Sequence, residues 1–244
     1  MAGFQQVRVL RDLEFKGVAS HTGNVKGNMS PERMTLADYF CDDTTSALWT
    51  ETLDGTNDDI APTAGGYPGL TLLSGDTDNQ VSFLGSALIF DISNNPVIET
   101  KVRLTDISQT SFFFGFSDAN TETTPASTID YADGTLAAAA TDACGFVSDA
   151  DKSSSQWYAA SIATGGSVTG TATGITPTDA TYVTLRVALD SSGNATFYIN
   201  GVPEHYEATA VTDVPLCAIF NFGTRDNGGG DNVYVKYFRA WQDI

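Results

Sequence analysis

The clearest pattern in the chain is an alternation of apolar and polar residues on both sides of a Ser-Ser-Gly-Asn turn. Apolar residues occupy every second position from Val183 to Leu189, and again from Ala195 to Ile199. A period of two places these side chains on one face of a strand. The pattern predicts a β-hairpin over residues 181–201, and a second sheet must cover its apolar face, because a lone hairpin is marginal in water.

Short apolar segments of the same kind recur between turn formers from residue 38 to the C-terminus. The sequence VIETKVRL at 97–104 alternates cleanly, and VYVKYFRAW at 233–241 alternates more loosely. Besides the two arms of the hairpin, strands are predicted at 48–53, 69–73, 80–84, 97–104, 111–116, 144–147, 156–162, 214–222 and 232–241. About ten strands at this spacing predict an all-β sandwich or barrel.

The N-terminal segment differs from the remainder in charge. Residues 1–33 hold five basic and three acidic residues, whereas the other 211 residues hold seven basic and 27 acidic ones. Pro31 before MTLADYF is typical of a short helix start. We interpret residues 1–37 as an arm or docking element that precedes a sandwich domain over 38–244; the alternative is an ordinary edge strand of that domain.

The net charge of −18 excludes some classes of partner. Binding to nucleic acid and to anionic membranes both depend on Lys and Arg, so neither is expected. The N-terminus lacks the apolar core of a signal peptide and no apolar run approaches the ~20 residues of a membrane span, so we expect a soluble chain made in a cytoplasm. Cys41, Cys144 and Cys217 are too few and too scattered for a disulfide framework.

Several segments, taken in order, resemble the jelly-roll sandwich of concanavalin A-like lectins and glucanases. They are DYF at 38–40, Trp49, GLTLL, ETKVRL, FFFGFSD at 112–118, GFVSDAD at 145–151, QWYAASI, ATFYING and VYVKYFRAW. More narrowly, the order is similar to the version found in virion proteins of tailed bacteriophages, in which such a sandwich follows a short arm. The resemblance implies a two-sheet antiparallel jelly roll over residues 38–244.

The catalytic pattern of the glucanases in that family is absent. It is Glu-x-Asp-x-Glu on one strand, which points three acids into a cleft, and no two glutamates here are two or four residues apart. His21 and His205 are isolated, and no Gly-x-Ser-x-Gly elbow exists. No catalytic residue is therefore predicted, and a polysaccharide-degrading enzyme is the third hypothesis.

No cofactor is predicted, and calcium is the small ion for which the sequence offers the best ligands. Asp149, Asp151 and Ser153 place oxygens at alternating positions, but the glycine and glutamate of an EF-hand loop are missing. The alternative is an ordinary Asp-rich turn.

Four aromatic residues near Asp or Asn are candidates for stacking on a sugar ring: Tyr131, Trp157, Tyr158 and Tyr206. The alternative is that the tryptophans pack in the core or at a sheet edge, as large aromatic side chains of sandwiches do.

The leading hypothesis is a non-enzymatic virion protein on the outer surface of a phage, namely a capsid decoration protein whose partner is the major capsid protein. Its arm would dock on the coat through apolar and basic residues: Val7, Arg8, Val9, Arg11, Leu13 and Phe15. The alternative is a carbohydrate-binding module of a tail fibre or spike. The resemblance also implies self-association as a homotrimer.

Overall fold

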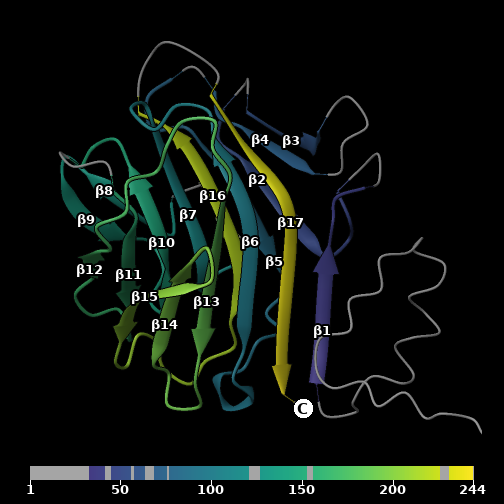
Figure 1. Ribbon diagram of the computed structural model, residues 1–244, viewed down its shortest axis with the longest axis vertical. Coiled ribbons are helices and arrows are strands. Elements are labelled where there is room, and N and C mark those ends of the chain that lie inside the picture. Colours follow the sequence, from purple (N-terminus) through teal and green to yellow (C-terminus); the bar gives the residue numbers. More distant parts are fainter. Residues whose placement is uncertain are drawn as a thin grey trace, which may run out of the picture.

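The structure, a computed structural model, describes residues 33–41, 45–55, 58–63, 69–75, 77–120, 127–152, 156–225 and 231–243. Two antiparallel sheets lie face to face and enclose the core between them (Figure 1). The predicted all-β sandwich is confirmed. No helix in the described ranges is long and apolar enough to cross a membrane.

The first sheet, called sheet A, has eight strands. In spatial order they are β15 (Val202–Glu207), β14 (Ala195–Ile199), β13 (Val183–Leu189), β6 (Val97–Leu104), β17 (Asn232–Asp243), β4 (Leu70–Leu73) and β3 (Asp59–Pro62), with β1 (Arg33–Asp38) paired to β17 as well.

The second sheet, called sheet B, has seven strands. In order they are β12 (Thr169–Ala172), β11 (Tyr158–Ile162), β10 (Ala143–Asp149), β7 (Thr110–Ser117), β16 (Cys217–Thr224), β5 (Val81–Ser86) and β2 (Trp49–Leu53). A separate hairpin is formed by β8 (Ile129–Ala132) and β9 (Thr135–Ala138), and a short 3-10 turn, η2, spans Ile92–Asn94.

The hairpin predicted from the alternation is confirmed as β13 and β14. Leu189 pairs with Ala195 across the turn, and the carboxylate of Asp190 accepts hydrogen bonds from the backbone N–H groups of Ser192 and Asn194 at 2.8 and 3.1 Å. These two backbone N–H groups thus find their hydrogen-bond partner within the turn itself. The apolar side chains of both strands face the sandwich core.

Aromatic rings fill the space between the sheets. The centroid of the Trp49 ring lies 6.0 Å from Phe40, 5.8 Å from Phe220 and 5.0 Å from Phe238. The indole N–H of Trp49 donates to Asp38 at 2.9 Å, so the one polar atom of this ring is satisfied. This bond fastens the end of β1 to the core.

The prediction of a helix after Pro31 is wrong for residues 33–38, where the described part of the chain begins. Residues 33–38 form β1, which pairs antiparallel with β17 from Arg33↔Asp243 to Asp38↔Phe238. The alternating side chains of MTLAD suit a strand, and the partner that stabilises it is distant in sequence. Residues 33–37 therefore belong to the sandwich and not to the arm; the predicted docking residues from Val7 to Phe15 lie outside the described ranges.

A β-bulge explains why β17 alternates loosely. Its pairing with β6 shifts between Val235 and Tyr237, so Lys236 has no partner in that register. As a result Lys236 is exposed next to the outward-facing Tyr237, while Val235 and Phe238 both remain buried in the core. A bulge of this kind redirects side chains without breaking the sheet.

No disulfide links the three cysteines, and the structure predicts that they react differently with a thiol reagent. Cys41 is exposed, whereas burial raises the pKa of Cys217 to about 12 and raises that of Cys144 further. Because the thiolate is the reactive form, one thiol per native chain is expected to react quickly with a disulfide reagent, and all three are expected to react in denaturant. Rapid modification of more than one native thiol would contradict the packing.

Candidate functional site: the covered outer face of sheet B

The outer face of sheet B carries a second apolar core. Phe113 on β7 is fully buried there, and its ring lies against Gly115 and Gly145 on two neighbouring strands. The sheet contributes further buried side chains to this cluster, namely Phe83, Val147, Tyr158, Ala160, Ile162, Cys217 and Ile219. A sheet face exposed to water would alternate with polar residues, so this face is built to be covered.

The cover is the hairpin of β8 and β9, which Figure 1 places beside β10 and β11. Its turn consists of Asp133 and Gly134, both with positive φ (48° and 76°), which is the backbone that a two-residue type I′ turn requires. Ile129 and Tyr131 point into the second core and are buried. The hairpin therefore covers the face over β7 and β10, and the backbone of Ala119 and Asn120 lies over β16 and β5.

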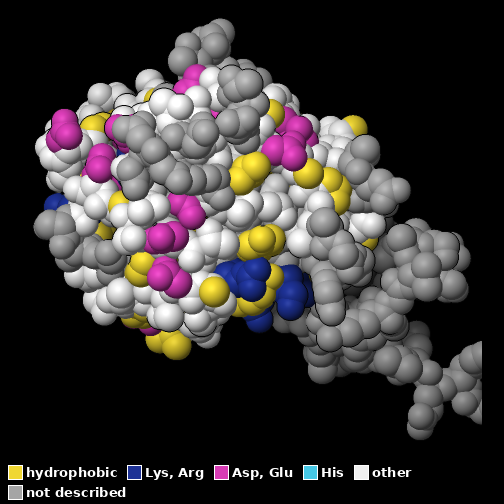
Figure 2. Space-filling model, turned by 90° about the horizontal axis from the view of Figure 1, so that it is seen from above, with side chains coloured by type: hydrophobic (Ala, Val, Ile, Leu, Met, Phe, Trp, Pro, Cys, Tyr) yellow, Lys and Arg dark blue, Asp and Glu magenta, His cyan; other side chains and the backbone are white. Residues whose placement is uncertain are grey.

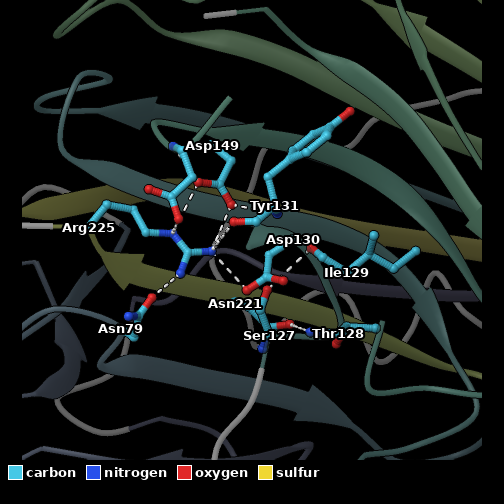
Figure 3. Close-up of polar contacts among 10 residues, drawn as sticks. Asn79, Ser127, Thr128, Ile129, Asp130, Tyr131, Asp149, Asn221 and Arg225 are labelled. Carbon is cyan, nitrogen blue, oxygen red and sulfur yellow. Dashed lines mark hydrogen bonds and ion pairs between the residues drawn. The ribbon is translucent and has the colours of Figure 1, made fainter. Parts of the chain in front are cut away.

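A single arginine connects the hairpin to the sheet. Arg225 follows β16, and its guanidinium forms two hydrogen bonds with Asp149 at the end of β10, at 3.0 and 2.8 Å (Figure 3). It also bonds Asp130 of the hairpin at 2.8 Å and the backbone oxygen of Tyr131 at 3.1 Å. Only 6% of the Arg225 side chain is exposed, so these bonds form away from water.

Two further bonds hold the hairpin backbone. The N–H of Tyr131 donates to Asp149 at 2.9 Å, and the N–H of Thr128 donates to Asn221 on β16 at 2.8 Å. Both acceptors are buried side chains on the outer face of sheet B. Buried polar groups with satisfied partners fix one arrangement, because breaking a bond leaves an unpaired group in the interior.

The positive charge of Arg225 is stabilised by its acidic partners. Burial alone would lower the pKa of Arg225, but the hydrogen bonds and negative charge of Asp149, followed by Asp130, raise it well above its ordinary value. The guanidinium therefore remains charged at every physiological pH. At Asp149, burial raises the pKa of the carboxyl in spite of the hydrogen bonds and charge of Arg225. The bonds of the permanently charged guanidinium to Asp149, to Asp130 and to the backbone of Tyr131 make the cluster a structural lock.

The predicted calcium ligands are partly visible in this lock. Both oxygens of Asp149 accept hydrogen bonds from Arg225, and Asp151 lies 3.8 Å from the same side chain. Arg225 thus supplies the positive charge that a cation would bring to these carboxylates. Ser153 lies outside the described residues, and no cluster of three acids, histidines or cysteines suited to a metal occurs among the residues that the structure places.

The four predicted glycan-stacking residues do not form one surface. Tyr131, Trp157 and Tyr158 are buried, with 4%, 1% and 5% of their surface exposed, and Tyr131 packs edge-on against Tyr158 at 5.1 Å. Trp157 lies in the sandwich core, as the packing alternative expects. Only Tyr206 on β15 is open to solvent, at 58%.

The arrangement of the two sheets matches solved structures of very different activity. A β-glucanase of Bacillus licheniformis has a TM-score of 0.57 at 12% identity, over 84% of this chain and 97% of that one. The fold is the concanavalin A-like jelly roll. Peanut lectin matches with a TM-score of 0.55 at 12% identity, over 87% of this chain and 99% of the lectin chain. A Shewanella oneidensis protein of unknown function matches with a TM-score of 0.53 at 12% identity, over 95% of this chain and 97% of that one.

Comparison by sequence adds nothing to this fold assignment, because no family model and no curated protein matches the chain. At 12% identity the likeness establishes the fold alone. Hydrolases and lectins share it, so whether the chain is an enzyme has to be argued from its own residues.

Sequence reasoning missed Arg225, Asp130 and Asn221 as members of a site. The hairpin itself had a local signal, because Asp-Gly between IDYA and TLAA is the usual sequence of a type I′ turn. The arginine had no such signal: its partners Asp130 and Asp149 are 95 and 76 residues away in the chain.

Proposed function

We propose that the chain is a non-enzymatic virion structural protein of a phage, and specifically a capsid decoration protein. The observation that carries the proposal is the closed outer face of sheet B. An active site needs a hollow that substrate can enter and acids that are free to act. Here Asp149 is buried beneath the hairpin, and Arg225 pairs with it and with Asp130 of the hairpin.

The distribution of charge supports attachment through the N-terminal segment. Residues 1–33 carry a surplus of basic residues, and the remainder of the chain is strongly acidic. The sandwich begins with Arg33 on β1. A positively charged segment in front of an acidic domain suits a module that is anchored at one end and displayed at the other.

The copy number of the chain in purified particles tests this proposal. Quantitative mass spectrometry should give a simple ratio to the major coat protein, and absence from particles would contradict it. Deletion of residues 1–32 leaves β1 intact; attachment is expected to be lost while the thermal unfolding of the sandwich is unchanged. Particles that retain the shortened chain at full occupancy would refute docking through the arm.

Carbohydrate binding in a tail fibre or spike is the second candidate, favoured by the exposed ring of Tyr206. Aromatic rings on a surface stack on sugar rings. If this function holds, a glycan screen should detect binding that Tyr206→Ala abolishes. Binding that survives in Tyr206→Ala would exclude this ring as the site.

A further inference from the structure

The basic residues of the sandwich gather on the outer face of sheet A. Seven Lys and Arg residues follow Arg33 in the chain. Five of them lie on strands β6, β13 and β17 with outward-facing side chains: Lys101, Arg103, Arg186, Lys236 and Arg239. Figure 2 shows such a separation, with dark-blue side chains clustered beside hydrophobic ones and magenta acids scattered elsewhere.

Three of these cations converge on one aromatic ring. Lys101 Nζ, Arg103 Cζ and Lys236 Nζ lie 5.9, 5.2 and 4.9 Å from the centroid of Tyr182. None of the three takes part in a salt bridge with any other residue in the described ranges. Like charges gathered without an acid repel one another, so an anion at this point would be stabilised.

The one acid on β6 is already engaged. Glu99 precedes Lys101 by one outward position on β6, but its carboxylate accepts hydrogen bonds from Arg186 at 2.5 and 2.8 Å and from Tyr237 at 3.0 Å. Its negative charge is therefore balanced by Arg186. The three cations around Tyr182 are left without a counter-charge from this strand.

Arg103 is held in a position suited to an oxyanion. Its guanidinium lies 4.3 Å from the ring centroid of Tyr234 on β17 and 5.2 Å from that of Tyr182, the residue before β13. The strands β17 and β13 lie on either side of β6. Stacking fixes the plane of the guanidinium and leaves its N–H edge as the donor. The buried Nε of Arg103 has no hydrogen-bond partner within the described part of the chain.

A hollow of about 310 Å³ opens at this place. It is lined by Thr63, Gly69, Arg103, Tyr182, Tyr234 and Lys236 among others. The bulge in β17 presents Lys236 to it. Gly69 forms part of the wall, and a larger residue would not fit there, because a Cβ would lie 2.9 Å from the backbone oxygen of Val235. The hollow exceeds the ~30 Å³ share of one water roughly tenfold, so it accommodates more than a single carboxylate.

We propose that this hollow binds an acidic sugar unit, a ring that carries a carboxylate, as part of an anionic polysaccharide. Arg103 would bind the carboxylate along its N–H edge, and Lys101 and Lys236 would neutralise its charge. The rings of Tyr182 and Tyr234 and the hydroxyl of Thr63 would contact the sugar itself. The inference does not depend on the virion proposal and concerns the sheet opposite to the closed face.

Isothermal titration calorimetry of the full chain tests the site, with a uronic-acid trisaccharide as the probe and a neutral trisaccharide as its control. We expect binding of the acidic probe alone, weakened about tenfold or more by Lys236→Gln and by Arg103→Lys, which keeps the charge but loses the bidentate edge. Lys152→Gln is the matched control, because Lys152 also lies over a tyrosine ring, that of Tyr131 at 4.8 Å. It should bind as the parent does.

The outcomes separate the alternatives. No binding of the acidic probe, equal binding of the neutral one, or equal losses in Lys236→Gln and Lys152→Gln would each overturn the proposal. Free acetate or phosphate that competes at the same concentration as the trisaccharide would reduce the site to a simple oxyanion site and overturn the assignment to a sugar. Because Lys236 is exposed, Lys236→Gln is expected to fold normally, and its thermal unfolding verifies this.

Discussion

Replacing Arg225 with alanine is expected to destabilise the protein by about 3–5 kcal/mol, a fall in Tm of about 10 °C for a domain of this size. The variant leaves Asp149 buried beside the second core without its counter-charge, and it removes the contacts to Asp130 and to the backbone of Tyr131. The loss of stability arises more from leaving the buried carboxylate of Asp149 unpaired than from losing its attraction to Arg225. Thermal unfolding followed by circular dichroism measures it.

The matched control is the exposed ion pair of Arg33 and Asp243. Its atoms lie 3.8 Å apart, and the two side chains are 45% and 52% exposed. Arg33→Ala should change stability by less than about 1 kcal/mol, because solvent screens a surface pair. Equal losses in Arg225→Ala and Arg33→Ala would show that Arg225 is not the buried lock described here.

Gly115→Ala is expected to have an effect of similar or larger size, about 4 kcal/mol or more, because the outer face of sheet B has no room for a side chain there. A Cβ at Gly115 would overlap the backbone oxygen of Cys144 and lie 2.5 Å from the Cα of Gly145. Both obstacles are backbone atoms of the adjacent strand, which cannot move without breaking the sheet. Little folded protein, or a greatly lowered Tm, is the expected result.

Gly166→Ala serves as its control, since the added Cβ would meet its nearest neighbour, the backbone oxygen of Ala163, at 3.2 Å in an exposed turn. A loss below about 1 kcal/mol is expected. If both alanine variants unfold at the same temperature, the close packing of β7 and β10 is incorrect.

The sequence alone predicts the strands in which apolar and polar residues alternate regularly. β6, β13 and β14 alternate cleanly and were predicted close to their observed bounds, because one face packs in the core and the other meets water. β17 was predicted too, but its bulge could not be placed, since the position of the extra residue depends on its register with β6.

The missed strand β1 depends on a partner far away in the chain, whereas β3, β12 and β15, also missed, pair with a strand next to them in sequence. β1 is a strand because β17 offers it an edge about 200 residues later, and local cues at Pro31 favoured a helix. β7 was predicted as a strand, but the burial of both its faces was not. A strand buried on both faces loses its alternation, which in hindsight is the signal that sheet B is covered on its outer side.

The sites were less predictable than the fold. Trp157 and Tyr158 have the composition of a sugar platform but are buried, because burial depends on what the neighbouring strands cover. The hollow on sheet A joins Arg103 on β6, Lys236 on β17 and Tyr182 just before β13, which are neighbours only in the folded sheet. Neither arrangement can be derived from spacing along the chain.

The central claim is that the hairpin of β8 and β9 closes the outer face of sheet B, and amide hydrogen exchange at Tyr131 tests it most directly. This N–H donates to the buried carboxylate of Asp149. It should exchange as slowly as the amides of β7 and β16, and far more slowly than those of the exposed turn at 164–167. Rapid exchange at Tyr131 while β7 stays protected would show that the hairpin opens readily, that the face is accessible, and that the case against an active site there fails.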